Sequence, residues 1–325
     1  MIGSLPHTDP NKACSLVARY LSKAPAWPQL PKRSFLEEMI VQYSEGMPGL
    51  VINTNSLSIR HDESFEYSVE KLYSSYINNE YSSYPISVRH AAGLHEFMNT
   101  FNQSCVATKG QIVGPLTFGL MLKDDQGQSI LHDEFMIDLC ARLLRLKASW
   151  QENELRKLGK KTIMFIDEPV MASYGSAYFT VSKEKILKML GEVIGGISGI
   201  CGIHCCGNTD WSILLNTNIH IISFDAYNYA SSLEFFPSEV KAFLDRGGAI
   251  AWGIVPNTPE TLQKENISSL KDRLEEAMAP FIRHGIKHKQ LKEQCLITPC
   301  CGLSGLSETA AESALALLLQ LSEAI

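Results

Sequence analysis

Short apolar runs alternate with amphipathic stretches through most of the chain, and this alternation restricts the possible fold more than any other feature. The run KTIMFIDEP at 161–169 follows a stretch, 129–159, in which apolar residues recur every three or four positions. Because strands that alternate with helices pair in parallel, the pattern predicts a parallel sheet. Six runs are predicted as strands: 110–119, 161–169, 196–207, 219–227, 248–256 and 295–303. Helices are expected over 129–159, from Thr209, over 235–245, from Thr258 to Arg283 and over 307–324.

Two weaker strand candidates near the start, IGSLPH at 2–7 and AWPQLPK at 26–32, bring the predicted strands to eight. Eight such units predict a single (β/α)8 TIM barrel that spans residues 1–325. A doubly wound open sheet is the alternative. Residues 33–105 fit the repeat poorly and are rich in Tyr, Ser and Asn. We interpret them as a helical insertion after strand two, over the top of the barrel.

The composition of the chain indicates which binding partners and which cellular compartment to expect. The formal net charge is −6 and Lys and Arg show no strong cluster, so neither a nucleic acid nor a membrane surface is an expected partner. The chain has no apolar run of membrane-spanning length, and its first residues lack the pattern of a signal peptide. We therefore expect a cytoplasmic protein. Its nine cysteines include two adjacent pairs, Cys205–Cys206 and Cys300–Cys301, which do not suit a disulfide framework.

Unusual side chains gather at the predicted ends of strands, which is where barrel enzymes place their chemistry. Potential metal ligands follow three different strands: His204, Cys206, Asp225 and Cys301. Other notable residues at strand ends are Ser4, Pro31–Lys32, Gly114–Pro115, Asp167–Glu168 and Gly253. The sequence FIDEP at 165–169 has a second interpretation, in which Asp167 or Glu168 caps a helix that begins at Pro169.

The spacing His-x-Cys in GIHCCGNTDW, residues 202–211, has a physical meaning on a strand. Side chains two residues apart point to the same face, so His204 and Cys206 can bind one ion while Cys205 points away. With Cys301 as a further sulfur ligand, this donor set suits Zn²⁺ best. The alternatives are a buried strand end with small cysteines, or a redox pair, which is less favoured because vicinal disulfides are strained.

Seven motifs occur in one order over nearly the whole chain: IGSLPHTDP, GPLTFG, FIDEP, HCCGNTDW, ISFDA, WGIVPN and PCCGL. This order resembles the catalytic barrel of cobalamin-independent methionine synthase. It also resembles the methylcobamide:coenzyme M methyltransferases of the uroporphyrinogen decarboxylase superfamily. The resemblance implies a zinc ion held by His204, Cys206, Asp225 and Cys301, of which His204, Cys206 and Cys301 are the predicted catalytic residues.

Two of these metal-ligand assignments, Asp225 and Cys301, are less direct than the others. The acidic ligand is usually Glu in the family, and Asp225 is shorter by one carbon. Cys300 is a rival of Cys301, although the match to Cys-Gly-Leu favours Cys301.

The resemblance also implies a reaction, in which a zinc-activated thiol attacks a methyl group. Ile2, Ser4 and Asp167, together with Glu168, are the predicted substrate-binding residues, with homocysteine or coenzyme M as the thiol. The family has a Glu at the end of strand two that binds the amino group of homocysteine, but this chain has LPKRS there. Candidate replacements are Glu37, Glu38 and Glu45.

The chain differs from the folate-dependent enzyme at the segments expected to bind folate. We therefore expect the methyl donor to be a methylcobamide, carried by a corrinoid-binding partner protein. The chain reads GPLTFGLML and GIVPNTP where the folate enzyme has a Trp and an Asp-x-His segment, and it has no counterpart of that enzyme's N-terminal half. Three alternatives remain: a folate-dependent enzyme like methionine synthase, a metal-free relative of uroporphyrinogen decarboxylase, and a non-catalytic module that binds zinc or a corrinoid protein.

Overall fold

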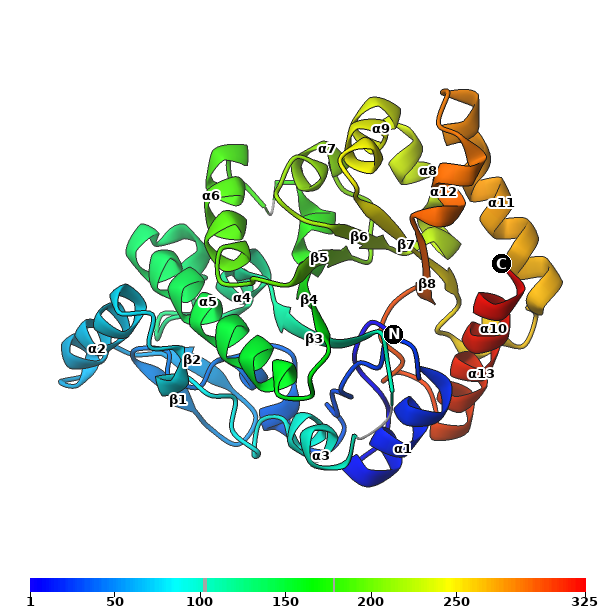
Figure 1. The fold of residues 1–325 in the computed structure, drawn as a ribbon. Coiled ribbons are helices and arrows are strands. Elements are labelled where there is room, and N and C mark those ends of the chain that lie inside the picture. The colour runs from blue at the N-terminus through cyan, green and yellow to red at the C-terminus, as the bar shows by residue number, and fades with distance from the viewer. Residues whose placement is uncertain (102–103, 178) are drawn as a thin grey trace.

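A parallel six-stranded sheet forms the centre of the computed structural model, which describes residues 1–101, 104–177 and 179–325 (Figure 1). Neighbouring strands follow one another in chain order, and the order never reverses. An α/β fold with a parallel sheet is therefore confirmed, and the doubly wound alternative does not fit because it requires a reversal. The strands are β3 (Ala107–Val113), β4 (Lys161–Asp167), β5 (Ile200–Cys205), β6 (Ile221–Phe224), β7 (Ala249–Val255) and β8 (Cys295–Pro299).

The two N-terminal strand candidates do not form regular strands among the described residues. Each makes only isolated parallel bridges, Ser4 with Gln29 and Ala26 with Lys109. The physical reason is the prolines at 25, 28 and 31, which remove amide donors that a strand ladder needs. The N-terminal segment nevertheless lies between β3 and β8 (Figure 1). The sheet is a half-barrel, and the predicted barrel of eight regular strands is not confirmed.

Helices lie outside the curved sheet (Figure 1). The expected helix over 129–159 is α5 (Glu134–Arg156), which begins where Asp133 accepts hydrogen bonds from the amides of Phe135 and Met136. The strand expected over 110–119 ends at Val113, because Pro115 starts a helix there. The other helices outside the insertion are α1 (Pro10–Tyr20), α4 (Pro115–Met121), α6 (Lys183–Ile194), α7 (Trp211–Leu215), α8 (Ala226–Glu234), α9 (Pro237–Asp245), α10 (Pro259–Leu262), α11 (Ile267–Arg283), α12 (His288–Glu293) and α13 (Glu308–Ala324).

The insertion expected over 33–105 is only partly helical, and residues 102–103 of it lie outside the described residues. It contains two helices, three short 3-10 turns and an antiparallel pair of strands that the sequence did not suggest. Its second half packs beside α5, where Arg142 lies 4.2 Å from the centre of the Tyr76 ring. These elements are η1 (Phe35–Glu37), η2 (Val41–Tyr43), β1 (Leu50–Ile52), β2 (Leu57–Ile59), α2 (Phe65–Ile77), η3 (Tyr81–Ser83) and α3 (Ala92–Thr100).

A small group of apolar side chains packs on the strands of the sheet. Phe165, Ile221 and Ala251 make a small buried apolar cluster there. Gly202 leaves room for the Phe165 ring, since a Cβ at Gly202 would lie 2.8 Å from that ring. Among the described residues, no helix has both the length and the apolar character that crossing a membrane requires.

Candidate metal centre and active site

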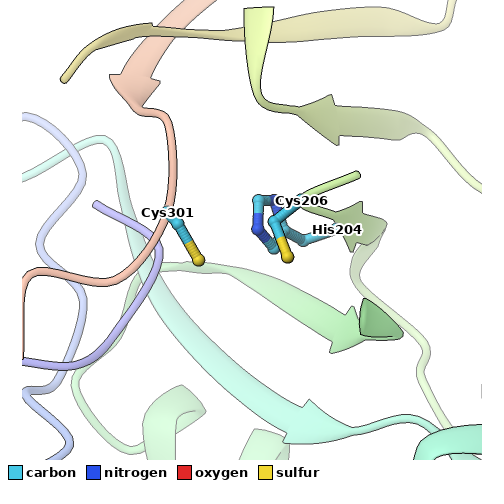
Figure 2. Close-up of side chains that lie close together, drawn as sticks. All are labelled: His204, Cys206 and Cys301. Atoms are coloured by element: carbon cyan, nitrogen blue, oxygen red, sulfur yellow. The ribbon is translucent and has the colours of Figure 1, made fainter. Parts of the chain in front are cut away.

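Three of the predicted metal ligands converge at one end of the sheet. His204 lies near the end of β5, Cys206 follows that strand, and Cys301 follows β8. Their ligand atoms all lie within 4.8 Å of one another, and Figure 2 shows the side chains approaching from these two segments. Cys205 is buried on the other side of the strand, with its Sγ 3.7 Å from the carbonyl oxygen of Gly207. This placement is the one that strand alternation predicts.

His204 is held in an orientation that leaves one ring nitrogen available. Its Nδ1 lies 3.0 Å from the Oγ of Ser223, which is its neighbour on β6 in the strand register. Its Nε2 is buried and has no hydrogen-bond partner. An unpaired buried polar atom costs free energy unless a ligand occupies it, and a hydrogen bond at the other ring nitrogen commonly orients an imidazole that binds a metal. The Nε2 of His204 therefore fits the role of a metal ligand.

The two sulfur ligands share a site that favours one negative charge. The adjacent side chains of Cys301 and His204 lower the pKa of the Cys206 thiol to about 4. The same contact with Cys206, together with burial, raises the pKa of Cys301. The pair therefore holds one thiolate readily, which is the form that binds metals. One imidazole nitrogen and two sulfur atoms form a donor set that fits zinc.

Cys300 and Asp225 lie outside the group of three. The Sγ of Cys300 donates to Oδ1 of Asn257 at 3.1 Å, so the geometry favours Cys301 over its neighbour. The carboxylate of Asp225 caps α8, where it accepts from the backbone amide and the side-chain amide of Asn228 at 2.9 and 2.7 Å. The role of Asp225 as a metal ligand stays a prediction.

A cavity of about 390 Å³ opens beside the three ligands. The predicted substrate-binding residues Ile2, Ser4 and Asp167 line it. Three carboxyl groups reach the cavity, and none of its described lining residues is Lys or Arg. The remaining lining residues are Gln29, Pro31, Glu37, Glu38, Met39, Pro169, Gly302 and Ser304. Of these, Pro31, Glu37, Glu38, Pro169 and Gly302 belong to segments that the sequence analysis singled out, whereas Gln29, Met39 and Ser304 carried no signal of their own.

Two buried carboxyl groups of the cavity have an unpaired oxygen. Burial raises the pKa of Asp167 to about 6, and its Oδ1 has no partner. Glu37 accepts a hydrogen bond from Arg33 at 2.6 Å through Oε1, while its Oε2 has no partner and burial raises its pKa. Of the three glutamates considered from the sequence, Glu37 and Glu38 line the cavity. The third, Glu45, has its Oε2 3.6 Å from Nδ1 of His90. Both unpaired oxygens are suited to a cationic donor.

Glu168 is not among the described residues that line the cavity, and its carboxylate caps α4 and not the short 3-10 helix η5 (Pro169–Ser173) that follows it. It accepts from the backbone amides of Leu116 and Thr117 at 2.9 Å and from the Thr117 hydroxyl at 2.6 Å. A Cβ at Gly114 would lie 2.1 Å from this carboxyl group, which explains the glycine of the GPLT motif. Burial raises the pKa of Glu168 to about 7, although these hydrogen bonds oppose the shift. Its substrate-binding role stays a prediction, and its observed contacts hold α4 in place.

Replacing Glu168 with Ala is expected to lower the free energy of unfolding by about 2 to 3 kcal/mol, because buried donors of α4 would lose their acceptor. Chemical denaturation followed by circular dichroism measures this change. Glu70→Ala serves as the control, since Glu70 is exposed on α2. Equal stability of the two variants would mean that the cap contributes nothing.

Comparison with known proteins gives a consistent but distant relationship. No family model matches the chain. A curated methionine synthase from Methanocaldococcus jannaschii is 27% identical over 202 residues, which cover 61% of this chain and 58% of that protein. The crystal structure of a candidate vitamin-B12 independent methionine synthase from Listeria monocytogenes superposes with a TM-score of 0.61 at 13% identity, over 98% of this chain and 86% of that one. The resemblance to methionine synthases is thus confirmed by the curated relative, and the structural comparison shows a shared fold.

Proposed function

We propose that this chain, which resembles methionine synthases, is a zinc-dependent methyltransferase that methylates the sulfur of a small thiol. The observation that carries the proposal is the group formed by His204, Cys206 and Cys301 beside a cavity with carboxylate walls. The likeness to methionine synthases supports the reaction type, and the donor set supports the metal.

Each residue of the centre has a distinct task in this proposal. Zinc bound here would act as a Lewis acid that keeps the acceptor sulfur deprotonated and nucleophilic at neutral pH. Ser223 contacts Nδ1 of the His204 ring and leaves Nε2 available to the metal. Cys206 supplies a thiolate readily because its pKa is lowered to about 4. We retain Asp225 as the proposed fourth ligand, a role in which its carboxylate would give up a hydrogen bond with Asn228.

The charge of the cavity favours homocysteine over coenzyme M as the acceptor. Glu37, Glu38 and Asp167 line the cavity, and its described lining offers no Lys or Arg. Carboxylates attract an ammonium group and repel the sulfonate of coenzyme M. The same charge disfavours the uroporphyrinogen decarboxylase alternative, since a substrate with many carboxylates needs basic residues. Glu37 is the proposed replacement for the family's glutamate that binds the amino group.

The variant Glu37→Gln is expected to raise the KM for homocysteine about tenfold, because a charge-assisted hydrogen bond to the amino group would be lost. Steady-state kinetics with homocysteine measure the change, and Glu70→Gln on α2 is the control. A thiol without an amino group, such as 2-mercaptoethanol, should react equally with both variants. An unchanged KM for homocysteine would remove Glu37 from the acceptor site.

The proposed methyl donor is a methylcobamide carried by a corrinoid-binding protein. The chain lacks the residues that the folate enzyme has after its GP-x-T motif and after strand seven. A second candidate is a folate donor, which the name of the Listeria protein favours because it describes a vitamin-B12 independent enzyme.

One assay separates the two donors. Reduced, zinc-loaded protein and homocysteine are incubated with either methylcobalamin or methyltetrahydrofolate, and methionine is measured by mass spectrometry. Methionine formed with methylcobalamin supports the proposed donor, and methionine formed only with the folate would replace it. Absence of methionine with both donors would contradict methyl transfer to homocysteine.

A further inference from the structure

A buried lysine contacts the N-terminal segment that lines the cavity, and the proposed reaction gives it no role. Lys109 is on β3 and is 6% exposed. Its Nζ donates to the carbonyl oxygen of Ile2 at 2.7 Å and to Oε1 of Gln111 at 3.1 Å, and it lies 4.7 Å from the centre of the Phe165 ring. Both acceptors are neutral, so the ammonium is buried without a direct ion pair to either of them.

Burying an ammonium in this way costs free energy unless its contacts compensate. Burial lowers the pKa of Lys109 to about 8, and the charge of Asp167 acts in the opposite direction. Burial raises the pKa of Asp167, and the positive charge of Lys109 partly offsets this shift. The charges of Lys109 and Asp167 therefore stabilise each other, although the contacts of Lys109 are with neutral groups.

The contact with Ile2 connects the lysine to the acceptor site. Residues 2–5 form no regular strand and are held by few backbone hydrogen bonds, such as Leu5 to Gln29 at 2.9 Å and Leu303 to Ser4 at 2.9 Å. Ile2 and Ser4 both line the cavity. A fixed donor on β3 would limit how far this segment can shift.

We propose that Lys109 is a positioning residue of the acceptor site, which fixes the Ile2–Ser4 segment at the cavity through its hydrogen bond to the carbonyl oxygen of Ile2. This inference rests on the proposed function, since it assumes that a thiol binds in this cavity. Lys109 would act on the affinity for the acceptor and not on the metal, because its contacts are with Ile2, Gln111 and Phe165.

The test uses the whole chain with Co²⁺ in place of zinc, so that thiol binding is followed by the visible spectrum without turnover. Homocysteine is titrated into the wild-type protein and into Lys109→Met, Lys109→Gln and the control Lys12→Met, in which Lys12 is exposed on α1. We expect Lys109→Met to weaken homocysteine binding and to raise its KM about tenfold. Metal content and kcat should stay within about threefold of the control.

The outcomes distinguish a failure of the proposed function from a failure of the role of Lys109. A wild-type spectrum that does not respond to homocysteine would overturn the proposed function itself. A wild-type response with equal affinity in Lys109→Met would overturn the role of Lys109 alone. If Lys109→Met does not fold, Lys109→Gln takes its place, since it keeps a hydrogen-bond donor without the charge. Loss of folding or of metal in both variants would assign Lys109 to stability and overturn the positioning role.

Discussion

Replacing Cys206 or Cys301 with Ser is expected to remove the bound zinc and to lower methyl transfer by more than about 100-fold. The structure brings only three predicted ligands together within the described residues, so each supplies a large share of the metal affinity. Loss of an outer partner of a metal ligand already costs about 10- to 100-fold, and loss of a direct sulfur ligand should exceed that. Plasma mass spectrometry measures the zinc, and methionine formation measures the activity.

The chain provides a matched control for each of these variants. Cys205 precedes Cys206 and Cys300 precedes Cys301, but their sulfur atoms contact Gly207 and Asn257 instead of the other ligands. Cys205→Ser and Cys300→Ser should therefore keep zinc and activity. If Cys205→Ser lost as much zinc as Cys206→Ser, the assignment of the ligands by strand face would be wrong.

The second large effect is expected for Asp167→Asn, which should lower kcat/KM for homocysteine about 100-fold while the zinc content stays unchanged. Asp167 lines the cavity, and its Oδ1 is buried without a partner. A charge-assisted hydrogen bond from an amino group to a buried carboxylate is worth about 1.5 to 3 kcal/mol, which corresponds to about 10- to 100-fold. Steady-state kinetics on the zinc-loaded variant measure the loss.

Asp272→Asn is the matched control for this change, because Asp272 is exposed on α11. A thiol that lacks the amino group should react with Asp167→Asn nearly as fast as with the wild-type protein. If kcat/KM for homocysteine were unchanged in Asp167→Asn, the acceptor would have to bind elsewhere.

Buried central strands were predictable because their apolar runs are continuous and end in Gly, Pro or Asp. The six strands from β3 to β8 all overlap the ranges expected from the sequence, although every one is shorter than expected. The N-terminal segments were not predictable as isolated bridges, since their pairing depends on contacts with Lys109 and Leu303 that are far apart in the chain. The strand pair β1–β2 was missed because its two strands have only three residues each.

The alternation of side chains along a strand made part of the candidate site predictable from the sequence. This applies to residues whose direction is set by the local strand geometry alone. His204 lies on β5 and Cys206 immediately follows that strand. Because the two residues are two positions apart, their side chains point to the same face. Asp225 and Glu168 are different, because each carboxylate meets the N-terminus of a helix. The helix that Glu168 caps lies some 50 residues earlier in the chain, so no local pattern could reveal it. Glu37 and Lys109 likewise depend on how distant segments pack around the cavity.

The zinc K-edge X-ray absorption spectrum of the purified, reduced protein, recorded without and with homocysteine, tests the central claim most directly. We predict that the protein contains zinc bound by the two sulfur atoms of Cys206 and Cys301 together with nitrogen or oxygen donors. Addition of homocysteine should add one sulfur atom to the zinc. A protein that holds no zinc, or a sulfur count that stays the same when homocysteine is added, would contradict the proposal that this centre activates the acceptor thiol.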